Sequence, residues 1–253
     1  MKKLLNVFTL VALLILTSCG NDDEPDAKFD DVTLTYENTY TIPNGNGIVW
    51  ESSNDLIASV SGNTIKAEHV GEATISSEIG SFKVTVQASL NSFKEPCFDF
   101  GTSKSNIKSF MNSYSGVSLY KEDATTLSYS GSSNQLVILL TYMFENSKLS
   151  SSGIALNSNY ITVDTMSKFL LERYIPLAVD ESDNSFYFIN PQKNMAVAMQ
   201  LSYVSNTIVY IVVYTKLDST STRSSVNIKS LFNIDFEKSE ELKPYFDEFK
   251  KRL

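Results

Sequence analysis

Few residues of this chain could do chemistry. Its 253 residues include two cysteines, Cys19 and Cys97, and one histidine, His69. A serine or cysteine nucleophile is commonly activated by a histidine base, and a first-row metal site takes three or four ligands. A single histidine without a neighbouring cysteine or aspartate meets neither need. The sequence therefore predicts no catalytic residue, no metal site and no cofactor, with Cys97 a small buried residue and His69 a loop residue.

The acidic stretch Asp180–Asn184 resembles the first half of a calcium loop. A complete loop needs glycine at its sixth position and glutamate at its twelfth. Those positions hold Ser185 and Pro191. We therefore interpret the stretch as a solvated hairpin turn.

Cys19 comes directly after a characteristic N-terminal sequence pattern. Lys2 and Lys3 give a positive start, and the run from Leu4 to Leu16 is apolar except for Asn6 and Thr9. A charged start, a short apolar run and small residues before a cleavage point are typical of a secretory signal peptide. The run is too short for a membrane-spanning helix, which needs about 20 apolar residues. Residues 1–18 are therefore predicted to be a signal peptide.

Leu16-Thr17-Ser18-Cys19 resembles a bacterial lipobox. The resemblance implies cleavage before Cys19, lipid on its sulfur and acylation, for example by palmitate, of the new amino group. Several acyl chains give a durable membrane anchor where one would be marginal. The acidic stretch Asn21–Glu24 resembles the export tag of Bacteroidetes-type surface lipoproteins. We expect a lipid anchor in the outer membrane with the chain at the cell surface; a periplasm-facing anchor is the alternative.

Composition limits the class of protein and its partners. Without residues 1–18 the chain has 235 residues, with 19 basic against 29 acidic side chains, so its net charge is near −10. Such a balance disfavours nucleic acid as a partner, because binding it requires basic patches. A hydrophobic content of 42%, with 15 Phe and 13 Tyr, indicates a globular chain of one or two domains. With Cys19 lipidated, Cys97 has no internal partner for a disulfide.

Residues 19–30 are polar and acidic and are predicted to form a flexible tether. From residue 31 to residue 88 short alternating apolar runs are separated by Gly, Asn and Pro, and Gly62-Asn63 is a hairpin signal. Ile48-Val49-Trp50 is one of these runs. This spacing, without a helical stretch, predicts a small all-β sandwich.

The same region resembles the bacterial Ig-like domain, group 2. The residues that carry the likeness are Trp50-Glu51-Ser52-Ser53-Asn54, Ile57–Ala67 with its Gly62-Asn63 turn, and Val70-Gly71-Glu72-Ala73-Thr74-Ile75. The resemblance covers residues 31–88 and implies a stalk or adhesion module without catalytic residues. Trp50 could be a sugar-stacking platform, but the resemblance favours a core position.

A polar linker, Ser89–Glu95, precedes a second domain predicted at residues 96–217 and separable from the first. Ile107, Phe110, Met111 and Tyr114 share one helical face, and apolar residues alternate from Leu136 to Phe144. The pattern recurs at an ungapped offset of 59 residues, so that Leu140 and Met199 occupy equivalent places. This internal repeat predicts an α+β domain of two α-β-β-β units, with a six-stranded antiparallel sheet and helices on one face.

Residues 218–253 form a C-terminal tail. Leu242, Phe246, Phe249 and Leu253 follow a helical period, with Pro244 suited to the first turn. We expect an amphipathic helix that packs on the sheet; a partner-binding helix is the alternative.

Together these features predict a lipid-anchored binding or adhesion protein of the cell envelope, without catalytic activity, in which an Ig-like stalk presents an α+β head to a glycan or protein ligand. An envelope protein inhibitor or assembly factor is the alternative. A hydrolase with an unusual site is the least favoured class.

Overall fold

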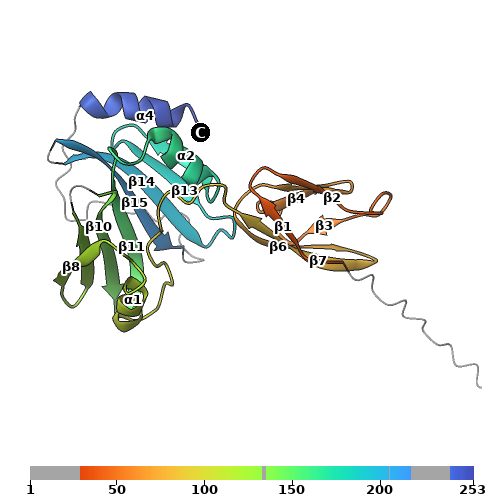
Figure 1. Cartoon of the computed structure of the whole chain (residues 1–253), viewed down its shortest axis with the longest axis horizontal. Coiled ribbons are helices and arrows are strands. Elements are labelled where there is room, and N and C mark those ends of the chain that lie inside the picture. The colour runs from red at the N-terminus through yellow and green to blue at the C-terminus, as the bar shows by residue number, and fades with distance from the viewer. Residues whose placement is uncertain (1–28, 133–134, 205, 218–239) are drawn as a thin grey trace, which may run out of the picture.

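The computed structural model describes residues 29–132, 135–204, 206–217 and 240–253. Two units, mostly of β-structure, lie end to end along the long axis (Figure 1). The first unit contains strands β1–β7, and the second contains β8–β15 with the described helices. The predicted signal peptide and Cys19 lie outside the described residues.

The first unit is built from two small sheets around one core. Its strands are β1 (Val32–Thr35), β2 (Thr39–Thr41), β3 (Glu51–Ser52), β4 (Ala58–Ser61), β5 (Thr64–Ala67), β6 (Gly71–Ser77) and β7 (Gly80–Gln87). The sheet orders are β1-β7-β6-β3 and β2-β5-β4, and β1 pairs with β7 in parallel. Ile65 of one sheet and Ile75 and Val84 of the other are fully buried in the shared core.

The predicted hairpin at Gly62-Asn63 is confirmed, because β4 and β5 pair across it. Gly62 has a φ of +60°, which glycine adopts without strain. The run Ile48–Trp50 is not a strand, since β3 begins at Glu51. The short strand β2 was not predicted, because its three residues carry only one apolar side chain.

The second unit contains one antiparallel sheet of eight strands. Its elements are α1 (Lys104–Met111), β8 (Val117–Glu122), β9 (Thr126–Gly131), β10 (Val137–Glu145), β11 (Lys148–Asn157), α2 (Val163–Leu171), β12 (Ile175–Asp180), β13 (Ser185–Ile189), β14 (Met195–Val204), β15 (Thr207–Lys216), η1 (Glu240–Leu242) and α4 (Lys243–Lys250). The strand order is β12-β13-β14-β15-β11-β10-β9-β8. The chain thus builds one half of the sheet, then the other, and joins them through β11 and β15.

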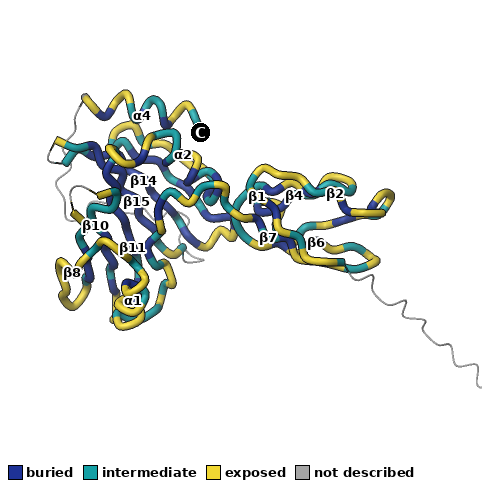
Figure 2. The backbone as a smooth tube through the Cα atoms, viewed as in Figure 1, coloured by how far each residue is buried: buried dark blue, intermediate teal, exposed yellow. Residues whose placement is uncertain are grey.

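The prediction of six strands is wrong, because each half contains four. The missed strands, β8 and β12, are the two edges of the sheet. Most of their side chains are exposed, so neither has the apolar alternation of a strand with one buried face. Figure 2 shows β8 largely in the colour of exposed residues beside the buried central strands.

The predicted recurrence of elements at about 59 residues is present in the structure. The two helices begin with equivalent caps, since Ser103 Oγ accepts from Asn106 N–H at 3.4 Å and Thr162 Oγ1 from Thr165 N–H at 3.1 Å. Such caps satisfy backbone donors that a helix start leaves open. Leu140 and Met199 are both fully buried in the same core cluster, as their equivalence requires.

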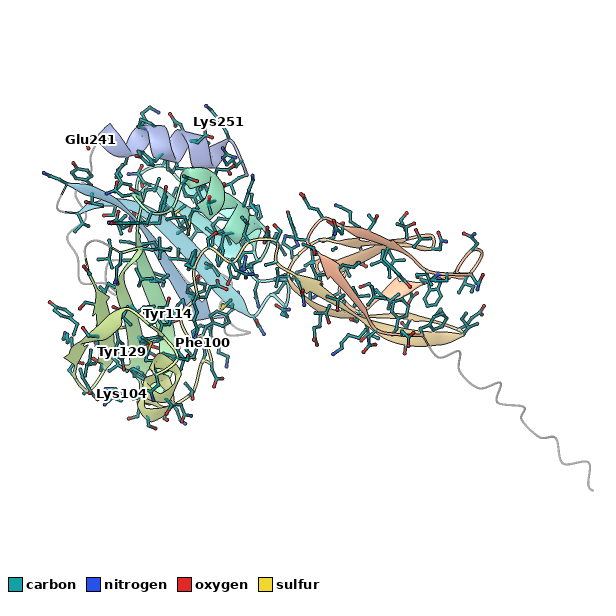
Figure 3. The ribbon with its side chains drawn as sticks, viewed as in Figure 1. Phe100, Lys104, Tyr114, Tyr129, Glu241 and Lys251 are labelled. Carbon is teal, nitrogen blue, oxygen red and sulfur yellow. The ribbon has the colours of Figure 1, made fainter. Side chains whose placement is uncertain are left out.

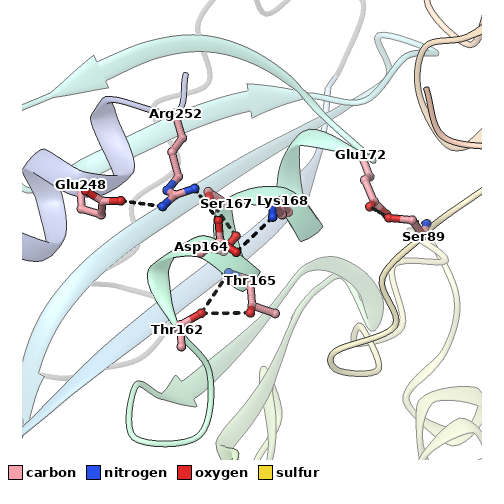
Figure 4. Close-up of polar contacts among 9 residues, drawn as sticks. All are labelled: Ser89, Thr162, Asp164, Thr165, Ser167, Lys168, Glu172, Glu248 and Arg252. Carbon is pink, nitrogen blue, oxygen red and sulfur yellow. Dashed lines mark hydrogen bonds and ion pairs between the residues drawn. The ribbon is translucent and has the colours of Figure 1, made fainter.

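The helices α1, α2 and α4 all contribute to the core on one face of the sheet. Pro244 lies in the first turn of α4, as predicted. The rings of Phe246 and Phe249 lie 4.7 and 4.5 Å from that of Phe186, so this helix packs on the sheet. Its C-terminal side is tied to α2 by Arg252, which pairs with Asp164 and Glu248 (Figure 4).

The equivalence of Leu140 and Met199 yields a stability prediction. Because each side chain is fully buried, Leu140→Ala and Met199→Ala should each lower the free energy of unfolding by about 2–5 kcal/mol. Denaturant midpoints of the purified chain measure the change. Leu119→Ala, at a side chain that is 53% exposed, is the matched control and should have little effect. A mild effect at either buried position would contradict the shared core layer.

Candidate functional site

The structure places the residues singled out in the sequence apart from one another. Trp50 is 6% exposed, and its ring packs edge-on against Phe29 and Phe82. Its indole N–H donates to the Gly45 carbonyl at 3.3 Å. Trp50 is therefore a core residue of the first unit and offers no face for a sugar.

His69 and Cys97 lie in different units. His69 is in the loop between β5 and β6, where Nδ1 is 2.7 Å from the Leu56 carbonyl. Cys97 is a free, half-buried cysteine in the second unit, so the prediction that it is buried is wrong in degree. Burial is incomplete because the chain around Cys97 crosses the surface of the sheet outside any strand or helix. Within the described residues, no group of three His, Cys, Asp or Glu side chains is arranged to hold a metal ion.

The stretch Asp180–Asn184 is the hairpin turn predicted from the sequence. It joins β12 to β13, which pair antiparallel. Asp180 Oδ1 accepts from the Ser182 backbone N–H at 2.9 Å and from its hydroxyl at 2.7 Å. The carboxylate at the start of the turn thus fixes the turn itself.

The chain between the units contains the best candidate for a site. We call residues 93–99 the crossing segment, because they lie on the helix face of the sheet. Phe93 stacks on Phe169 of α2 at 4.0 Å, and Phe98 stacks on Tyr214 of β15 at 5.5 Å. The Cys97 N–H donates to the Tyr142 hydroxyl at 3.4 Å. The crossing segment is therefore fixed to α2 and to both halves of the sheet.

The carboxylate of Glu95 lies at the centre of this arrangement. Its Oε1 accepts from the hydroxyls of Tyr174 at 2.6 Å and Tyr214 at 2.9 Å, and its Oε2 is 3.6 Å from Arg173 Nε. The Glu95 side chain is only 18% exposed. Burial raises the pKa of Glu95, although the Tyr174 hydrogen bond, Arg173 and the Tyr214 hydrogen bond each oppose that shift. Burial also raises the pKa values of Tyr174 and Tyr214, so both remain hydroxyl donors.

Sequence reasoning missed Glu95. It reads as one charge in a polar linker, and its two tyrosine partners lie 79 and 119 residues further along the chain. Tyr142 belongs to the predicted alternation from Leu136 to Phe144, but alternation gives only the face of a side chain and not its partner.

An apolar hollow of about 480 Å³ adjoins the crossing segment. Phe110 of α1 forms its other wall, together with residues 94–99. Lys94 Nζ lies 4.8 Å from the centre of the Phe110 ring, and the Tyr114 hydroxyl donates to the Lys94 carbonyl at 2.5 Å. Figure 3 shows Tyr114 and Phe100 on the α1 side of the second unit, away from Glu241 and Lys251. The hollow offers ring faces and little polar surface, so it suits an apolar side chain better than a sugar.

A second hollow, of about 400 Å³, lies in the first unit and is lined by Gly47, Val49, Glu51, Ser76, Ser77 and Glu78. Val49 is 77% exposed there. Its polar lining residues are exposed or half-buried rather than buried, so it gives no ligand a preorganised contact.

The edges of the sheet carry the most exposed large apolar residues of the second unit. Tyr120 of β8 is 71% exposed and Leu177 of β12 is 61% exposed. Each is the extra residue of a bulge, and the residues that flank the two bulges pair with equivalent positions of β9 and β13. The two halves thus present exposed apolar side chains at equivalent places on opposite edges.

The opposite face of the sheet is not an open surface. Ala155, Ala198, Val209, Ile211 and Val213 form a buried cluster on it. The serine and tyrosine residues that alternate with core positions nearby predict a wet and available face. The central strands instead carry small and β-branched apolar residues there.

Comparison with known proteins finds no matching family model, no matching curated protein and no matching solved structure. In the part of the chain that the structure describes, no helix is long and apolar enough to cross a membrane.

The Glu95 contacts predict a measurable stability effect. Glu95→Ala leaves the hydroxyls of Tyr174 and Tyr214 without their acceptor, at about 1–3 kcal/mol for each buried donor. Glu95→Gln keeps an acceptor oxygen and should be milder. Urea unfolding of both variants measures the difference. Equal losses in the two variants would contradict a role of Glu95 as hydrogen-bond acceptor.

The raised pKa of Glu95 also predicts a pH dependence. A raised native pKa means that the native state binds the proton more tightly than the unfolded chain. The resulting stabilisation is present below the ordinary pKa of a glutamate and is lost as the pH rises through the raised native pKa. Unfolding midpoints between about pH 4 and 8 should decline less for Glu95→Gln than for the parent. Glu145→Gln, at an exposed carboxylate, is the control and should keep the parent's profile.

Proposed function

We propose that this chain is a lipid-anchored protein of the bacterial cell envelope that binds a partner through its second unit and catalyses no reaction. Cleavage before Cys19 and acylation of its sulfur and amino group would attach it to the outer membrane, with the acidic stretch Asn21–Glu24 directing it to the cell surface. The support for the anchor is the N-terminal pattern of charge, apolar run and Leu-Thr-Ser-Cys.

The first unit would be a bacterial Ig-like domain of group 2 that serves as a stalk. Two sheets packed around Trp50 support this assignment. The observation that carries the proposal is the placement of the two ends of this unit. Phe29 precedes β1, which runs parallel to β7 toward the linker, so Phe29 lies at the end remote from the second unit. Asn54 and Val70 contact the second unit at the other end, and Figure 1 shows the first unit projecting away from the second. An anchor on the N-terminal side would therefore hold the second unit away from the membrane.

The second unit would be an α+β head with two equivalent halves, and a protein is the partner that its surface favours. Tyr120 and Leu177 stand at opposite edges, and Phe98 is part of the apolar hollow. These side chains are scattered over three elements and form no aromatic row of the kind that stacks on a glycan. The paired edges also favour the second candidate function, an inhibitor or assembly factor that grips another envelope protein.

The anchor is tested by Cys19→Ala. We expect the parent to enter the detergent phase on phase partition of whole cells and to incorporate labelled palmitate, because its acyl chains are apolar. Cys19→Ala should lose both properties. Cys97→Ala removes the other cysteine and is the matched control, which should behave as the parent. A Cys19→Ala protein that still enters the detergent phase and takes up label would refute the lipid anchor.

A further inference from the structure

The joint between the two units is closed by a buried carboxylate. Glu172, at the C-terminal end of α2, is 2% exposed. Its Oε2 accepts from the backbone N–H groups of Ser89 at 2.9 Å and Leu90 at 3.1 Å. Its Oε1 accepts from the Ser89 hydroxyl (Figure 4). One side chain of the second unit therefore binds three donors of the linker.

Arg173 binds the carbonyl of Leu90, the linker residue whose N–H group donates to Glu172. Its Nη2 donates to the Leu90 carbonyl at 2.8 Å and its Nη1 to the Phe169 carbonyl at 3.1 Å. The guanidinium lies over the Phe169 ring, with its carbon 3.7 Å from the ring centre. The side chain of Arg173 is 11% exposed. Both the N–H and the carbonyl of Leu90 are thus bonded to consecutive residues of the second unit.

Two further contacts do not involve the linker. The Val70 N–H, in the loop before β6, donates to the Glu172 carbonyl at 2.8 Å. The Asn54 amide donates to the Pro191 carbonyl at 3.2 Å. Asn190 organises the loop that carries Pro191, because its Oδ1 accepts from the N–H groups of Asn194 at 3.0 Å and Met195 at 2.8 Å.

Gly71 follows Val70 and lies beside these contacts. A Cβ at this position would lie 2.8 Å from Ile57 Cδ1 and 3.4 Å from Gln192 Nε2, and the φ of Gly71 is +153°. The short distance is to Ile57 of the same unit, whereas 3.4 Å to Gln192 is an ordinary contact distance. Packing within the first unit therefore favours glycine here, and Gln192 of the second unit lies beside it.

We propose that these contacts make the two units one rigid body, with Glu172 as the positioning residue of the joint. Domains joined by a polar linker ordinarily move relative to each other. Here the linker is bonded on both sides, and two separate loops of the first unit contact the second. Given the proposed function, on which this consequence rests, the stalk would present the head in a fixed orientation.

Hydrogen exchange of the Val70 amide tests the joint. The acceptor of that amide is the backbone carbonyl of Glu172, which a side-chain substitution leaves in place. Glu172→Ala removes the acceptors for Ser89 and Leu90. If the joint opens as a unit, Val70 should exchange at least tenfold faster in this variant, although its own acceptor is unchanged. The measurement uses the purified full chain in detergent, read at single-amide resolution by mass spectrometry.

Asn54→Asp provides a second variant that acts from the other unit. The aspartate keeps the acceptor that caps Leu56 N–H, but it places a carboxylate against the Pro191 carbonyl. Val70 exchange should again rise at least tenfold, while the core amides of Val84 and Ile154 stay protected in both variants. Glu145→Ala and Asn38→Asp change exposed residues of the same types and should leave Val70 protected.

Two outcomes would overturn the rigid joint. One is a Val70 amide that exchanges in the parent as fast as an unprotected peptide. The other is parent-like Val70 protection in the Asn54→Asp variant, which remains informative if Glu172→Ala does not fold. A chain that fails the palmitate test but keeps a protected Val70 would refute the anchor and leave the joint standing.

Discussion

The pairing of β11 with β15 is the constraint on which the second unit depends. Seven residue pairs, from Ser151–Thr215 to Asn157–Val209, join the two halves into one antiparallel sheet. Without this pairing each half would expose a long inner strand with unpaired backbone groups and an apolar face. The helices, the crossing segment and the joint are all built on the sheet that this pairing creates.

The seam between the halves also explains where the crossing segment lies. Ser152 of β11 sits opposite Tyr142 of β10 on one side and opposite Tyr214 of β15 on the other. A small side chain between two tyrosines leaves room for the main chain to cross, and the tyrosine hydroxyls supply its polar partners. Tyr142 accepts from Cys97 N–H, and Tyr214 donates to Glu95. The linker residues that Glu172 and Arg173 bind lead directly into the crossing segment. The contacts at the seam and those at the joint therefore lie on one continuous stretch of chain.

The sequence predicts elements in which buried residues recur at the period of a helix or a strand. Alternation from Leu136 to Phe144 and the spacing of Ile107, Phe110 and Met111 predicted β10 and α1, and the offset of 59 residues predicted the second half. The edge strands β8 and β12 lack that signal, because most of their side chains are exposed and need not alternate. The sheet was therefore predicted with two strands too few. The polar contacts could not be predicted from the sequence for a different reason. Glu172 bonds to residues 82 and 83 positions away, and no local pattern marks a carboxylate for such a partner.

The two halves of the sheet are equivalent in sequence order but not in surroundings. Phe186 and Phe188 of β13 pack against the Phe249 ring of α4, whereas the equivalent residues of β9 are Leu127 and Tyr129. The edges differ as well. At equivalent register β12 has Pro176, which lacks a backbone N–H, and β8 has Leu119. A strand added to this sheet would therefore find a more complete row of donors on β8 than on β12. The helix α4 and Pro176 thus make the two halves of the repeated structure different. The edge strand β8 is the one with the more complete row of backbone donors.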